Sequence, residues 1–147
     1  MFCDTFSGVN ADPAPPGPRA VAVVRRGREL LVIKRHRAGR DYAVLPGGSV
    51  EPGETFEQAA VRELWEESTL QARVDFELLE AEHDGREARY FLMTDVEGSP
   101  ALSGPELEAH GPDNSFELVW AGVDDFHDLG LQPAHLREDL PRLLGLD

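Results

Sequence analysis

Residues 48–70 read GSVEPGETFEQAAVRELWEESTL, a glycine-containing turn followed by a segment typical of a helix. Thr55 is followed three residues later by Gln58, which is the pattern of a capping box at a helix N-terminus. From Thr55 to Ser68 the chain contains neither Gly nor Pro. We therefore expect a helix from Thr55 to about Ser68, entered from a turn that begins at Pro46.

Three glutamates, Glu63, Glu66 and Glu67, stand at positions i, i+3 and i+4 of this helix. Side chains at this spacing share one helix face, and three carboxylates there repel one another unless a cation lies among them. Mg²⁺ prefers such oxygen ligands, whereas the alternative is a solvated acidic face. We favour the cation site because the same arc of the helix also carries apolar residues, Phe56, Ala59 and Ala60.

The spacing of this stretch resembles the Nudix box, G-x5-E-x7-R-E-U-x-E-E-x-G-U, in which U is a bulky aliphatic residue. The matching residues are Gly48, Glu54, Arg62, Glu63, Leu64, Glu66, Glu67 and Leu70. The resemblance implies an α/β fold, an α/β/α sandwich with a mixed β-sheet. It also implies a divalent-metal-dependent hydrolase, using Mg²⁺ or Mn²⁺, that cleaves the diphosphate linkage of a nucleoside diphosphate derivative.

The resemblance also implies roles for individual residues. The metal ligands would be Glu63, Glu66, Glu67 and the carbonyl of Gly47, and Glu63 would serve as ligand or base. Arg62 would pair with Glu54 and orient the helix, and Gly48 would lie against the substrate. For the general base the candidates outside the box are Glu117, Glu106 and Glu108, each of which is otherwise a surface glutamate.

One position departs from the box, because Thr69 stands where Gly is expected. Glycine suits the left-handed conformation that often ends a helix, and a β-branched residue pays about 1–2 kcal/mol to adopt it. Either the helix ends differently here or another residue ends it. We expect an altered exit from the helix rather than lost chemistry, since the carboxylates upstream are complete.

The charge of the chain is strongly acidic, with 28 Asp and Glu against 14 Lys and Arg and a net charge of −14. Such a field repels a polyphosphate backbone and argues against nucleic-acid binding. Half of the basic residues nevertheless fall within residues 25–40. This basic strip either discourages aggregation at a sheet edge or binds substrate phosphate, and Arg35 and Arg37 are the candidates for phosphate binding.

From the rest of the sequence we expect one domain, residues 19–147. Residues 1–18 precede it as a flexible leader that contains prolines. The single cysteine, Cys3, lies in this leader. Strands are expected at 20–24 and 29–35 as a hairpin, and at 42–45, 74–81, 88–96 and 116–121. Short helices are expected near 124–129 and from Pro133, the last one kinked or shortened by Pro141. Several strands with few helices predict a mixed sheet covered by helices.

Two other functions fit parts of the sequence: a Nudix-like nucleotide-binding or sensor domain without turnover, and an acidic cation-binding protein. The second leaves the Gly–Glu–Arg spacing unexplained. No targeting or membrane-spanning segment is visible, so we expect a cytoplasmic monomer or homodimer that acts on a small nucleotide. The sequence does not choose among nucleoside triphosphates, sugar nucleotides and dinucleotides.

Overall fold

The computed structural model describes residues 17–102 and 111–146. Cys3, nearly all of the predicted leader, and the base candidates Glu106 and Glu108 lie outside the described residues. The strands are β1 (Arg19–Val23), β2 (Arg25–Arg26), β3 (Glu29–Arg37), β4 (Arg40–Val44), β5 (Gly47–Ser49), β6 (Gln71–His83), β7 (Arg86–Glu97) and β8 (Asn114–Gly122). The helices are α1 (Phe56–Ser68), the 3-10 turn η1 (Val123–Asp125), α3 (Phe126–Leu129) and α4 (Leu136–Leu144).

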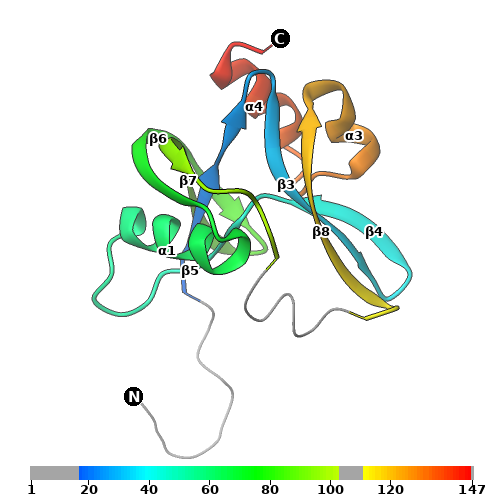
Figure 1. Ribbon diagram of the computed structural model, residues 1–147, viewed down its shortest axis with the longest axis horizontal. Coiled ribbons are helices and arrows are strands. Elements are labelled where there is room, and N and C mark those ends of the chain that lie inside the picture. The colour runs from blue at the N-terminus through cyan, green and yellow to red at the C-terminus, as the bar shows by residue number, and fades with distance from the viewer. Residues whose placement is uncertain (1–16, 103–110, 147) are drawn as a thin grey trace, which may run out of the picture.

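The strands form two sheets (Figure 1). The first has the order β5-β1-β7-β6 and is mixed, because β1 and β7 are parallel while the other neighbours are antiparallel. The second is antiparallel and centred on β3, which pairs with β8 along one side and with β2 and then β4 along the other. The predicted mixed sheet is present, and a second sheet lies beside it.

Helices cover both faces of the strands. In β1, Ala20 and Ala22 belong to the core that α1 completes with Leu64, whereas Val21 and Val23 belong to the core on the opposite face. That opposite core is completed by Phe126 of α3 and by Leu136 and Leu140 of α4. Because successive strand residues point to opposite faces, a strand buried on both sides reads as a continuous apolar run. The predicted α/β/α sandwich is confirmed.

The predicted hairpin between residues 20–24 and 29–35 is wrong for its first strand. Strand β1 is flanked by β5 and β7, so neither of its edges remains for β3. The chain instead passes from one sheet to the other after Val24, and only the short β2 pairs with β3. Both faces of β1 are buried, and this burial is typical of a central strand rather than of a hairpin edge.

The last helix also differs from expectation. Helix α4 begins at Leu136 and continues through Pro141 to Leu144, where Gly145 ends it in the left-handed conformation. Pro141 is buried, and the apolar side of α4 packs into the core through Leu136 and Leu140. Tertiary packing therefore holds the helix together across the missing backbone donor. Within residues 17–102 and 111–146, no helix has both the length and the apolar character needed to cross a bilayer.

Candidate active site

Helix α1 presents the predicted glutamates, and its start is fixed by the capping box that the sequence predicts. The Thr55 hydroxyl accepts a hydrogen bond from the Gln58 backbone N–H at 3.0 Å, and the Gln58 side chain accepts one from the Thr55 backbone N–H at 2.9 Å. These two bonds satisfy backbone donors that a helix N-terminus otherwise leaves unpaired. The first turn of α1 is thereby fixed beside Glu54.

Arg62 is the centre of an ion-pair cluster. Its Nε donates to Glu54 Oε2 at 2.7 Å and its Nη2 to Glu54 Oε1 at 3.0 Å, a bidentate pair. Its Nη1 donates to Glu63 Oε2 at 3.2 Å and to Glu66 Oε1 at 3.0 Å, and its Nη2 also reaches the Ser49 carbonyl at 3.0 Å. The predicted pairing of Arg62 with Glu54 is thus present in the structure, and it ties α1 to the loop and to β5.

This cluster shifts the titration of both partners in the bidentate pair. The hydrogen bond from the Arg62 guanidinium holds the pKa of Glu54 below its usual value, against a smaller opposing effect of burial. The same bond, with the nearby charge of Glu63, raises the pKa of Arg62 above its usual value. The two shifts agree in sign, and both favour the fully ionised pair.

Two of the glutamates lie over the glycines of β5. The backbone N–H of Gly47 donates to Glu67 Oε1 at 2.9 Å. A Cβ added to Gly48 would lie only 2.7 Å from Glu63 Oε1, so the Glu63 carboxylate occupies the space that any larger residue would need. A Cβ on Gly47 would meet the Ala20 carbonyl at 2.7 Å. The glycine pair therefore allows β5 to approach both β1 and the acidic face of α1.

The donor set fits a hard divalent cation, although the described residues contain no ready-made group of three His, Cys, Asp or Glu side chains around one point. Glu63 and Glu66 both accept hydrogen bonds from Arg62, which supplies the positive charge between them. Carboxylate oxygens beside an exposed strand backbone are the ligands that Mg²⁺ prefers. Glu63 and Glu67 are half-buried, whereas the side chain of Glu66 is 47% exposed.

Thr69 ends α1 in the same way as the glycine that it replaces. Its φ of 64° is left-handed, and its backbone N–H donates to the Trp65 carbonyl at 2.9 Å. The Thr69 hydroxyl donates to the Ser99 carbonyl at 3.1 Å. The expected change in the exit from the helix is therefore wrong, because this side-chain bond offsets part of the strain of a β-branched residue in that conformation.

A cleft of about 510 Å³ opens beside Glu67 and Gly47. It runs between the two sheets, and its lining combines cationic, aromatic and polar side chains. The lining residues that the argument below uses are Arg19, Arg35, Tyr42, His83, Phe116 and Gln132.

The guanidinium of Arg35 lies on the wall of the cleft, close to two aromatic rings. Its guanidinium lies 3.9 Å from the centre of the Phe116 ring and 5.7 Å from that of Tyr42. Its Nη2 donates to Asn114 Oδ1 at 2.7 Å, while its buried Nε has no hydrogen-bond partner among the described residues. A guanidinium fixed in this way places a positive charge on the wall of the cleft, and the neighbouring rings suit a planar base.

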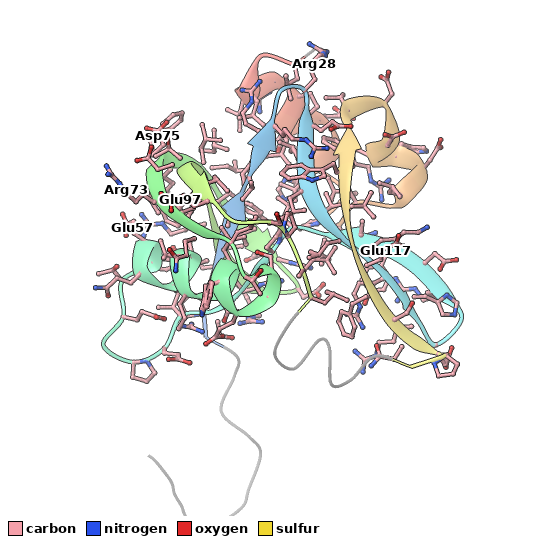
Figure 2. The ribbon with its side chains drawn as sticks, viewed as in Figure 1. Arg28, Glu57, Arg73, Asp75, Glu97 and Glu117 are labelled. Atoms are coloured by element: carbon pink, nitrogen blue, oxygen red, sulfur yellow. The ribbon has the colours of Figure 1, made fainter. Side chains whose placement is uncertain are left out.

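The other predicted substrate and base residues lie elsewhere. Arg37 is exposed and is not among the residues that line the cleft, to which Arg40 contributes instead. Glu117 is paired in register with Lys34, one residue along β8 from Phe116. Because neighbouring residues of a strand point to opposite faces, Glu117 faces away from the cleft that Phe116 lines. Figure 2 shows it on β8, on the opposite side of the view from Glu57 of α1.

Sequence reasoning missed several residues of the cleft. Gln132, which follows α3, lines the cleft, and Asn114 at the start of β8 does not line it but accepts a hydrogen bond from Arg35. His83 ends β6, and Arg19 begins β1. None of them stands within a recognisable motif, and only the pairing of distant strands brings them to one cleft.

Comparison with known proteins bears on the whole chain. A family model described as the NUDIX domain matches residues 15–140. The chain belongs to the NUDIX domain family. An 8-oxo-dGTP diphosphatase of Escherichia coli (strain K12) is 38% identical over 114 residues, which are 73% of this chain and 84% of that protein. The solution structure of the Escherichia coli ORF135 protein gives a TM-score of 0.67 at 25% identity and covers 86% of this chain and 89% of that one.

A second group of NUDIX relatives matches only part of the chain. A NAD-capped RNA hydrolase NudC of Pectobacterium atrosepticum is 48% identical over 58 residues, or 38% of this chain. The match spans 22% of the length of that relative. The family resemblance predicted from residues 48–70 is confirmed, and the relatives differ among themselves in the substrates that their names give.

Proposed function

We propose that the protein is a Mg²⁺-dependent hydrolase that cleaves a phosphoanhydride bond of a nucleoside diphosphate derivative. The observation that carries the proposal is the cleft, which has Glu67 and Gly47 on one wall and the Arg35–Phe116 pair on another. One wall offers oxygen ligands for a cation, and the other offers a cation and aromatic rings for a nucleotide. Two relatives, the 8-oxo-dGTP diphosphatase of Escherichia coli and the oxidized purine nucleoside triphosphate hydrolase of Danio rerio, support the reaction class.

In this mechanism the cation would be held by Glu63, Glu66, Glu67 and the carbonyl of Gly47. When bound, Mg²⁺ neutralises phosphate charge and lowers the pKa of a coordinated water. Arg62 positions the glutamates, because it joins α1 to Glu54 and to β5.

The cleft residues act on the nucleotide and on the proton. The guanidinium of Arg35 would bind a phosphate oxygen, and Phe116 and Tyr42 would contact the base. Glu67, which lines the cleft, is our candidate for accepting the proton from the attacking water. We assign no step to Glu117, because it faces away from this cleft.

The substrate is a free nucleotide rather than a nucleic-acid chain. A net charge of −14 opposes long polyphosphates, and the cleft supplies cationic side chains, Arg19, Arg35 and Arg40, for a small anion. The name of the Escherichia coli relative makes 8-oxo-dGTP the first nucleotide to test, ahead of dGTP, NADH, ADP-ribose and nucleotide sugars.

The test compares wild type with Glu67→Gln and with the control Glu57→Gln, an exposed glutamate of the same helix. We expect release of product from one member of the panel in millimolar Mg²⁺, a loss of about 10²-fold or more in kcat for Glu67→Gln, and no loss for the control. Nucleotide binding without turnover by wild type would instead establish the sensor domain. Turnover that survives Glu67→Gln would overturn the assignment of Glu67.

A further inference from the structure

A small recess adjoins the cleft. Its volume is about 10 Å³, close to the smallest space that holds one water-sized group. It shares Arg19, Val44, His83 and Gln132 with the cleft, so the two spaces adjoin. Tyr90 lines the recess and does not line the cleft.

Tyr90 brings an unsatisfied hydroxyl to this recess. The residue is 1% exposed, and burial raises the pKa of its phenol to about 12. Among the residues that the structure describes, its hydroxyl has no hydrogen-bond partner. A buried hydroxyl without a partner costs about 1–3 kcal/mol, so a fold that retains one calls for an explanation.

Arg19 places a second unsatisfied donor beside it. The Arg19 Nη1 donates to His83 Nδ1 at 3.0 Å, whereas the buried Arg19 Nε has no partner within the described part of the chain. Since a guanidinium can only donate, Nδ1 of His83 must be the unprotonated ring nitrogen. Burial and the charge of Arg19 lower the pKa of His83, which keeps the ring neutral. His83 therefore orients Arg19 without neutralising its charge.

The recess thus ends in hydrogen-bond donors. The Tyr90 hydroxyl can donate, the Arg19 Nε–H can only donate, and Arg19 carries a full positive charge. An oxygen that accepts hydrogen bonds satisfies both groups, whereas an amino group of a ligand could donate only to the Tyr90 oxygen and would leave the Arg19 Nε–H without an acceptor. The size of the recess limits that ligand group to a single oxygen.

We propose that the recess is a subsite for one acceptor oxygen of the bound nucleotide, held by the Tyr90 hydroxyl and by Arg19. This inference rests on the proposed function, because the nucleotide is the ligand proposed for the adjoining cleft. A phosphate oxygen and a keto oxygen of a base share the required chemistry. The subsite would favour ligands that place such an oxygen in the recess beside the cleft.

The experiment uses Tyr90→Phe, which removes only the hydroxyl, and Arg19→Lys, which keeps the charge and removes Nε. Affinities of wild type and both variants are measured calorimetrically in Mg²⁺ for pyrophosphate, GMP and AMP. We expect Tyr90→Phe to weaken one class of probe about five- to tenfold, the effect of one hydrogen bond. Weaker GMP with unchanged AMP identifies a keto oxygen, and weaker pyrophosphate identifies a phosphate oxygen.

Thermal unfolding without ligand provides the second measurement. Because the hydroxyl has no partner among the described residues, Tyr90→Phe is expected to keep or raise the melting temperature. A lower melting temperature with unchanged affinities would show that the hydroxyl is structural and would overturn the inference. Equal affinities of wild type and Tyr90→Phe for all three probes would overturn it while leaving the proposed function intact. Failure of wild type to bind any of the three probes would also overturn the inference, whereas the proposed function is decided separately by turnover of the nucleotide panel.

Discussion

The ion pair between Arg62 and Glu54 can be tested by Glu54→Gln, which removes a charge and keeps the size of the side chain. Arg62 donates to both oxygens of Glu54, at 2.7 and 3.0 Å, and the Glu54 side chain is 15% exposed. Each charge-assisted bond contributes about 1.5–3 kcal/mol, but glutamine retains one acceptor and solvent screens part of the remainder. We therefore expect the free energy of unfolding to fall by about 1–2 kcal/mol at pH 7.

The loss of stability in Glu54→Gln should become smaller as the pH falls. The pKa of Glu54 in the folded protein lies below its ordinary value of 4.5, so its contribution to stability is present above that value. It disappears as the pH falls through the lower folded value, because protonation breaks the ion pair in wild type. The difference in stability between wild type and Glu54→Gln should therefore be full at pH 7 and should narrow below about pH 4.5.

Urea unfolding at pH 7, 5 and 4 measures this difference, with Glu57→Gln as the matched control. Glu57 is a glutamate in the first turn of α1, close to Glu54 in the sequence, and it is exposed. We expect the control to change stability by less than about 0.5 kcal/mol at every pH. Equal losses for the two variants, or a gap that does not narrow on acidification, would refute the role given to the Arg62 cluster.

Three further outcomes follow from the site. Thr69→Gly should raise the melting temperature by about 2–4 °C, because relief of the left-handed strain exceeds the loss of the exposed bond to Ser99; no rise in a thermal scan would contradict this. Gly48→Ala should reduce kcat far more than stability, since the nearest atoms to the added Cβ belong to the Glu63 side chain, which can move. Gly47→Ala should instead lower stability, since its Cβ meets the backbone of Ala20. Measuring both unfolding and kcat for each variant distinguishes the two effects. Arg35→Lys should raise KM more than it changes kcat, because it loses the planar fork and the stacking on Phe116.

The local elements were largely predictable because they depend on neighbours in sequence. The capping box at Thr55 and Gln58 formed as predicted, since both of its bonds lie within one turn. The strands expected at 74–81 and 88–96 also formed, as β6 and β7, and Asp84 and Gly85 adopt positive φ in the turn between them. The hairpin assigned to β1 and β3 failed because two adjacent apolar segments do not reveal which sheet each will join.

The sequence by itself determined the acidic face of α1, its capped start and the pairing of Arg62 with Glu54, because these features depend on residue types at short, fixed spacings. The left-handed end of α1 at Thr69 was not predicted, because the sequence does not show that the threonine hydroxyl would bond to the Ser99 carbonyl. The cleft and the recess beside it were decided only by the tertiary structure. Arg19, His83 and Tyr90, which line the recess, lie on three strands, and they meet because β1 pairs with β7 and β7 with β6. Long-range strand pairing depends on burial summed over the whole chain, and no local pattern encodes it.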